Sequence, residues 1–183
     1  MNLVSAFLRD WRATGSIMPS SRFLQEGMMA RLDFDHIKLA VELGPGTGVI
    51  TSAILNRLSP EGKLVAVEIN ETFVDRLRQN VTDARLLPIH GSATDLPALL
   101  RDRGLGQADC VVSGIPFANL PIELRDEIVG AAVKALAPGG IFVAFQYAPL
   151  ALPPVLKQHF PQYRTNFVLL NVPPALVYSC QKN

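Results

Sequence analysis

Cysteine and histidine are scarce in this chain of 183 residues. The two cysteines, Cys110 and Cys180, form no C-x-x-C pair, which indicates buried free thiols in a reducing compartment and excludes a disulfide-stapled fold. His36, His90 and His159 are scattered without the spacing of metal ligands, so we expect no metal ion. The stability of the fold must therefore come from a hydrophobic core.

An excess of charge of one sign is also lacking. The chain has 17 Lys and Arg residues against 16 Asp and Glu residues, for a formal net charge of +1. Sequence-independent binding to nucleic acid depends on a broad basic field. The balance of charge therefore argues against nucleic acid as a partner.

No uninterrupted membrane-spanning run is present. Residues 135–156 carry no charge and are numerous enough to cross a bilayer, but proline or glycine interrupts them at positions 138, 139, 140, 149, 153 and 154. This segment predicts a helix end, a turn, a strand and a loop. The start of the chain has no long apolar core before Arg9 and Asp10, which argues against a secretory signal and favours the cytoplasm.

What the chain does contain is 49% hydrophobic residues, enough for a single domain over residues 1–183. Strand and helix patterns alternate, which is typical of an α/β fold with a parallel sheet. Only a short link with Pro173 and Pro174 separates the last two predicted strands, so we expect a hairpin there. The predicted strands cover residues 38–43, 63–67, 85–89, 108–113, 141–146, 166–170 and 176–180.

A glycine-rich turn joins the first predicted strand to a helix predicted over residues 47–58. Glycine at 44, 46 and 48 lets backbone approach a ligand closely, and the helix start offers unpaired N–H groups. A dinucleotide fingerprint G-x-G-x-x-G is excluded, because its third glycine would fall at Val49. A strand, turn and helix with glycines for packing is the alternative interpretation.

The compact turn, preceded by Glu42, resembles motif I of class I methyltransferases that use S-adenosylmethionine (SAM). The resemblance implies a seven-stranded Rossmann-like sheet with the last strand antiparallel and helices on both faces. It places Glu42 near the amino-acid part of the cofactor, and Glu68, at the end of the second strand, is suited to accept both ribose hydroxyls. The expected cofactor-binding residues are Glu42, Gly44, Gly46, Thr47, Gly48, Glu68, Ile69, Ser92, Ala93 and Ser113.

Two further loops follow strands three and four. Many relatives carry an aspartate at the position of Ser92 to hold the adenine amino group, so we expect contact through Ser92 and the Ala93 backbone. Asp95 is either a helix N-cap or a substitute contact. The loop with Ser113, Gly114 and Ile115 is expected to face the methyl donor.

Methylases of the adenine amine carry Asn or Asp before a Pro-aromatic pair. Pro116-Phe117 preserves part of that pattern, but Ser113 departs from it. Ribosomal-RNA adenine dimethylases also append a helical domain, whereas this sequence stops at Asn183. An RNA adenine N6-methyltransferase is therefore one alternative hypothesis, and a SAM- and membrane-binding module without catalysis is another.

The chain resembles more closely the bacterial phospholipid N-methyltransferases. This resemblance implies methylation of the amine of phosphatidylethanolamine toward phosphatidylcholine, at the inner face of the membrane. The segments that carry it are residues 7–9 with 15–21, residues 41–48, residues 113–117 with 119–121, and residues 171–175.

The sequence pattern of the N-terminal segment, residues 1–31, is consistent with a lipid substrate. An apolar stripe at helical spacing ends in Trp11, with arginines beside it, as in a helix that lies on an anionic membrane surface. A lid over the sheet is the alternative, and the two are compatible. The residues expected to dock are Phe7, Leu8, Arg9, Trp11 and Arg12.

Three neighbouring residues are candidates for substrate binding. Ser20 or Ser21 is expected to cap a helix over residues 22–31, while the other lines the site. Arg22 either meets a lipid phosphate or is simply solvated.

The reaction needs alignment and a neutral amine. An ethanolamine nitrogen arrives as an ammonium and must lose its proton before it attacks. Tyr147 is the candidate to orient this amine, with water carrying the proton away. Phe117 and Tyr147 offer aromatic faces to methylated cations, although packing in the protein is the alternative for both.

Overall fold

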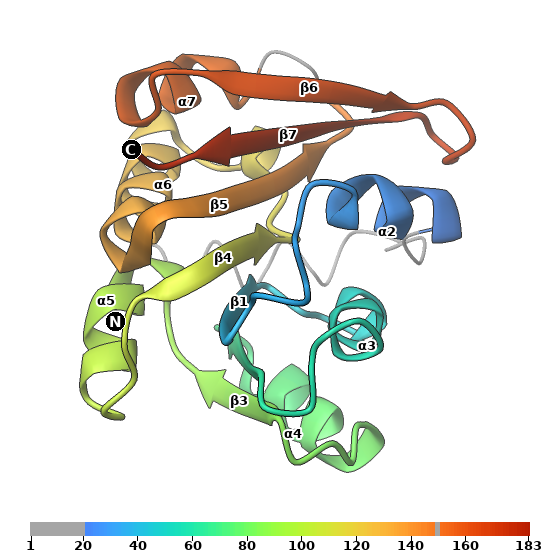
Figure 1. Ribbon diagram of the computed structural model, residues 1–183. Coiled ribbons are helices and arrows are strands. Elements are labelled where there is room, and N and C mark those ends of the chain that lie inside the picture. The colour runs from blue at the N-terminus through green and yellow to red at the C-terminus, as the bar shows by residue number, and fades with distance from the viewer. Residues whose placement is uncertain (1–20, 149–150) are drawn as a thin grey trace.

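The computed structural model describes residues 21–148 and 151–183 (Figure 1). Their strands form one seven-stranded sheet in the order β3-β2-β1-β4-β5-β7-β6. β7 is antiparallel to both β5 and β6, and the other neighbours are parallel. The strands are β1 (Leu39–Leu43), β2 (Lys63–Glu68), β3 (Leu86–His90), β4 (Ala108–Ser113), β5 (Leu136–Gln146), β6 (Tyr163–Val168) and β7 (Ala175–Gln181).

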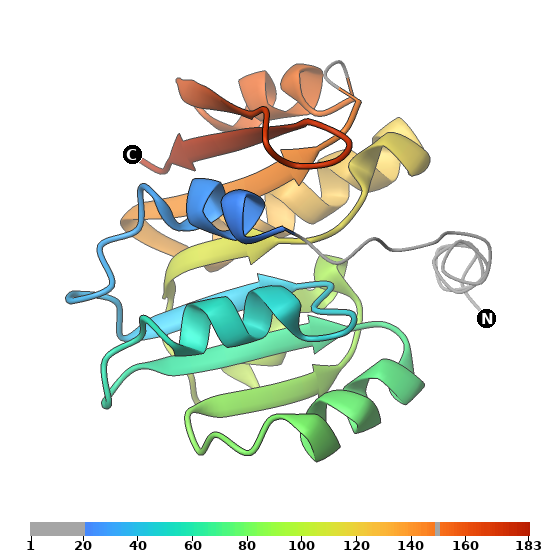
Figure 2. The same cartoon turned by 90° about the vertical axis from the view of Figure 1, so that its right-hand side faces the viewer.

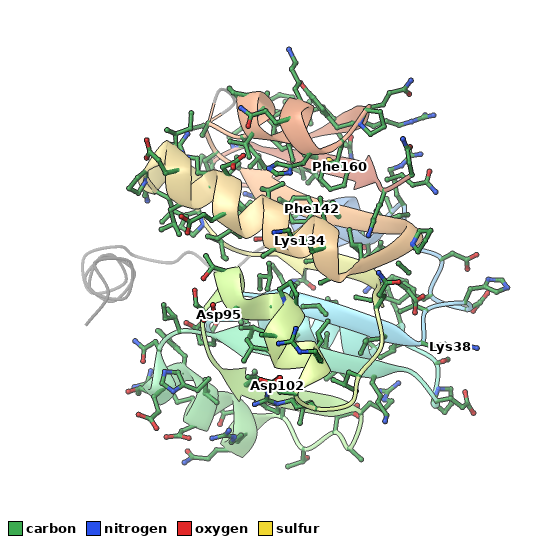
Figure 3. All side chains as sticks on the ribbon, turned by 90° about the vertical axis from the view of Figure 1, so that its left-hand side faces the viewer. Lys38, Asp95, Asp102, Lys134, Phe142 and Phe160 are labelled. Atoms are coloured by element: carbon green, nitrogen blue, oxygen red, sulfur yellow. The ribbon has the colours of Figure 1, made fainter. Side chains whose placement is uncertain are left out.

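Helices cover both faces of the sheet. Figure 2 shows α2, α3 and α4 in front of it, and Figure 3 shows α5 and α6 in front of the opposite face. The helices are α2 (Arg22–Met29), α3 (Val49–Leu55), α4 (Glu71–Asn80), α5 (Leu96–Arg101), α6 (Ile122–Ala135) and α7 (Pro153–His159), with 3₁₀ turns η1 (Ala93–Asp95) and η2 (Phe117–Asn119). The predicted fold, with its antiparallel last strand, is confirmed.

The core is divided between the two faces by the alternation of each strand. Val41 and Leu43 in β1 point into the cluster under α5, α6 and α7, whereas Ala40 points into the cluster under α2 and α3. Every residue of β1 is buried, as expected for a central parallel strand. Both cysteines are buried and free, as predicted, and burial raises the pKa of each thiol to about 12.

Several predicted boundaries are wrong. The fifth strand was expected at residues 141–146, but β5 begins at Leu136, and the helix expected over residues 22–31 ends at Met29. The sixth strand was expected at residues 166–170, but β6 ends at Val168 and the apolar residues after it form an exposed turn. The helix expected over residues 47–58 is the shorter α3, because Gly48 adopts a left-handed conformation at its start and Asn56 ends it.

No helix among residues 21–148 and 151–183 has the length and apolarity needed to cross a bilayer. The predicted docking helix of residues 1–12, and with it Ser20, lies outside the described residues.

Candidate active site

The candidate site lies where the strand order reverses. From β1 the chain proceeds to β2 on one side, whereas β4, the neighbour on the other side, leads outward to β5. The loops that follow β1 and β4 therefore diverge and leave room for a ligand at the carboxyl ends of the strands. Figure 3 shows the two ends of the sheet, with Asp95 at the carboxyl end and Lys38 at the other.

Glycines let the two loops meet. A Cβ atom on Gly114 would lie 2.9 Å from the carbonyl oxygen of Gly44, so the loops after β4 and β1 touch through their backbones. Gly44, Gly46 and Gly48 have φ values of 71°, 56° and 85°, which side chains disfavour. Backbone conformation therefore explains why glycine occupies all three positions of the predicted motif. The motif is a turn whose main chain a ligand can approach closely.

Glu68 ties the end of β2 to this turn. Its side chain is buried, Oε2 accepts a hydrogen bond from the Gly46 backbone N–H at 3.3 Å, and Oε1 accepts one from the Asn70 N–H at 3.0 Å. The two carboxylate oxygens are thus held in a fixed orientation beside the glycine turn. This is the placement that the sequence predicts for the acceptor of a sugar diol.

Glu42 is a fully buried carboxyl group beneath the turn. Its Oε2 accepts a hydrogen bond from Thr51 Oγ1 at 2.5 Å, while Oε1 has no hydrogen-bond partner among the described residues. Burial, with a smaller contribution from the charge of Glu68, raises the pKa of Glu42 to about 8. A buried oxygen without a donor favours a cationic ligand group, so Glu42 fits the ammonium of an amino-acid moiety.

Thr51 was not predicted from sequence. Its only signal is a hydroxyl on the otherwise apolar inner face of α3, one helical turn after the glycines.

The loop after β3 lies beside Glu68, because the Gly91 N–H donates to the Glu68 carbonyl at 3.0 Å. Ser92 Oγ accepts a hydrogen bond from the Thr94 N–H at 3.3 Å and so caps η1, and Ala93 is buried. Asp95 is exposed and occupies the N-cap position of α5 without a side-chain hydrogen bond to the helix. Between β2 and this loop, the Ile69 carbonyl accepts from His90 Nε2 at 3.1 Å.

The loop after β4 is fixed from within and from β5. Ser113 is buried, and its Oγ accepts a hydrogen bond from the Ile115 N–H at 3.3 Å. Gln146, at the end of β5, donates from Nε2 to the Ile115 carbonyl at 3.1 Å and accepts from the Ala118 N–H at 3.2 Å. Gln146 was missed from sequence, although a buried polar residue that closes an apolar strand is a usable signal.

The two aromatic candidates differ in exposure. Phe117 is fully buried in the core cluster, which favours its packing role over contact with a substrate. Tyr147 is 46% exposed and packs edge-on against Phe145, with 5.5 Å between ring centroids. Of these two rings, only that of Tyr147 is accessible to a ligand.

Ser21 is the helix cap that one of the two serines was expected to provide. Its Oγ accepts a hydrogen bond from the Leu24 N–H at 3.2 Å and donates to Asn171 Oδ1 at 2.6 Å. Arg22 is highly exposed and pairs with Glu26 at 2.8 Å on the surface of α2.

Known proteins resemble this chain in sequence. A family model described as a methyltransferase domain matches residues 40–140. The ornithine lipid N-methyltransferase of Singulisphaera acidiphila is 31% identical over 176 residues, covering 96% of this chain and 92% of that protein.

Solved structures share the fold. The precorrin-6y C5,15-methyltransferase of Geobacter metallireducens superposes with a TM-score of 0.73 at 16% identity, covering 93% of each chain. An O-methyltransferase from Bacillus cereus, solved in complex with S-adenosylhomocysteine, gives a TM-score of 0.70 at 14% identity and covers 97% of this chain and 91% of its own.

Proposed function

Because the chain belongs to the class I SAM-dependent methyltransferases, we propose that it transfers the methyl group of SAM to the amine of a membrane lipid. The observation that carries the lipid substrate is the 31% identity, over nearly the full length of both chains, to an ornithine lipid N-methyltransferase. Ornithine lipid, named for the relative, and phosphatidylethanolamine are the two candidate acceptors. Both present an amine to the aqueous side of a bilayer, so the same anionic membrane surface would deliver either.

The cofactor fits residues at the ends of three strands. Glu42, with a buried oxygen that lacks a donor among the described residues, would hold its ammonium, the turn of residues 44–48 would lie along its amino-acid part, and Glu68 would accept its ribose hydroxyls. Ser92 and Ala93 would flank the adenine, and Thr47 and Ile69 would contribute further contacts to the cofactor. When bound, SAM supplies a methyl group already activated by its sulfonium. The protein therefore needs to align the acceptor and exclude water.

The acceptor is positioned by the loop after β4. Ser113, Gly114 and Ile115 would line the methyl donor, and Gln146 keeps this loop in place. Tyr147, one residue beyond Gln146, orients the amine, and a water molecule takes its proton before transfer.

The test is transfer of labelled methyl groups from SAM to vesicles that contain phosphatidylethanolamine, ornithine lipid or, as a control, only phosphatidylcholine. An RNA transcript is assayed in parallel, and products are separated by chromatography. We expect label on an aminolipid and none on RNA. Label on RNA alone would show that the methyl acceptor is a nucleic acid and not a lipid. SAM binding without any methylated product would indicate a non-catalytic module.

A further inference from the structure

Among the residues that the structure describes, most of the exposed large apolar side chains lie at one end of the molecule. Leu87 lies in the edge strand β3, away from the others. Seven others belong to segments at the carboxyl end of the parallel strands, and we call them the apolar rim. The apolar rim consists of Phe23, Ile122, Tyr147, Phe167, Leu169, Leu170 and Val172.

Hydrogen bonds and strand pairing place these segments together. Phe167 pairs with Leu176, which in turn pairs with Gln146 at the end of β5. Ile122 begins α6 directly after the loop that follows β4. The rim therefore lies at the same end of the sheet as the candidate active site.

The turn of the β6–β7 hairpin forms its most exposed part. In Figure 1 this hairpin extends beyond the end of β5. Leu169, Leu170 and Val172 are 67–68% exposed, and residues 165–181 carry no charged side chain. Turns that face water are normally rich in polar residues, so an uncharged, leucine-bearing turn indicates contact with an apolar partner.

The turn is held in shape from inside. Asn171 is buried, donates from Nδ2 to the Pro173 carbonyl at 2.7 Å, and accepts from the Ser21 hydroxyl at 2.6 Å. A buried amide with these bonds presents the neighbouring leucines outward as a fixed surface.

The same contact shows where the N-terminal segment enters the structure. Residues 1–20 join the described chain at Ser21, against the hairpin turn. The sequence of residues 1–12 predicts an amphipathic helix with Trp11 on its apolar face and Arg9 and Arg12 beside it. Arg22, highly exposed next to the turn, forms an ion pair with Glu26 on the surface of α2.

We propose that the apolar rim inserts into the lipid bilayer, with the β6–β7 turn as the deepest part, so that the site opens onto the head groups. The inference rests on the proposed function, because a lipid substrate is what makes a bilayer the partner. Uncharged leucines suit the acyl chains, and Tyr147 and the flanking arginine suit the head-group layer.

The test compares two matched variants of the full chain. Leu169→Asp with Leu170→Asp changes the turn, and Leu87→Asp changes an exposed leucine outside the rim. The affinity for vesicles of phosphatidylethanolamine and phosphatidylglycerol, measured by co-sedimentation, should fall roughly a hundredfold for the turn variant, since roughly a tenfold loss is expected for each of the two leucines withdrawn from lipid. Leu87→Asp should bind vesicles like the parent chain, and thermal unfolding and SAM affinity should show that both variants are folded.

A fluorescent reporter identifies the occupant directly. Because both native cysteines are buried, Leu170→Cys can be labelled selectively with an environment-sensitive dye. A blue shift on addition of vesicles, absent when the dye is at Leu87→Cys, supports insertion. If the dye at Leu170→Cys already emits at shorter wavelength than the dye at Leu87→Cys before vesicles are added, residues 1–20 cover the turn and the proposal is overturned. If the parent chain is a dimer that the turn variant dissociates, a second copy covers the turn and the proposal is likewise overturned.

The failure of this proposal differs from the failure of the proposed function. Parental vesicle binding by a folded turn variant overturns insertion, even if the chain methylates lipid. If the parent methylates no aminolipid, the proposed function fails, whereas the vesicle-binding and dye measurements still decide on insertion.

Discussion

Gly114→Ala tests whether the two loops of the site must touch. The new methyl carbon would lie 2.9 Å from the Gly44 carbonyl oxygen, about 0.5 Å short of the 3.4 Å at which ordinary contact begins. Gly114 does not have a positive φ, so alanine fits its backbone and the effect comes from this contact alone. The loops must separate, at a cost of about 1–3 kcal/mol.

This cost should appear in cofactor binding, because the turn that moves is the one that holds SAM. If about 1.4 kcal/mol is expressed there, the affinity for SAM falls about tenfold. Calorimetric titration of the folded variant measures this change. Gly106→Ala is the control, since nothing lies within 4 Å of a Cβ atom at that position. Equal SAM affinity in the two variants would refute the close approach of the loops as a requirement for binding.

The remaining predictions concern the acids, the loop and the N-terminus. The pKa of Glu42 is raised from 4.5 to about 8, so its contribution to stability is complete below pH 4.5 and is lost as the pH rises through 8. Glu42→Gln should therefore flatten the pH dependence of the free energy of unfolding of the cofactor-free protein. An unchanged slope in the variant would contradict this role of Glu42. Glu68→Ala should weaken SAM binding by roughly tenfold or more, through loss of a charge-assisted acceptor worth about 1.5–3 kcal/mol, and unaltered calorimetric affinity would argue against its ribose role. Gln146→Ala frees the Ile115 carbonyl and should lower kcat more than SAM affinity. A loss confined to SAM affinity would contradict the role of Gln146 in positioning the methyl acceptor. Phe7→Asp with Trp11→Asp should abolish vesicle co-sedimentation and lipid methylation while SAM affinity stays near the parental value. If this variant binds vesicles and methylates lipid like the parent chain, the predicted N-terminal helix acts only as a lid.

The glycine turn and its two acids could be predicted because their signal is local. Glycine spacing, the acid before the turn and the acid that ends the next strand are each set by a single strand and its exit. Strands β1, β2 and β4 could be located because buried parallel strands are continuous apolar runs bounded by turn residues.

Contacts between distant segments could not be predicted in this way. Nothing near Gln146 in the chain shows that it holds the loop after β4, and nothing near Asn171 shows that it meets Ser21. The sixth strand was misplaced because hydrophobicity normally indicates burial, whereas Leu169 and Leu170 are exposed. Sequence and structure therefore disagree where apolar residues face outward.

The hydrogen bond between Ser21 and Asn171 also bears on the order in which the chain folds. Its two ends are 150 residues apart, and α2 packs on β6 and β7, which are the last strands to be made. During synthesis, the N-terminal segment is therefore available for most of translation before its partner exists. The contacts of α2 with α3 and β5 can form before the hairpin is complete, whereas its packing on β6 and β7 must wait until that hairpin has left the ribosome.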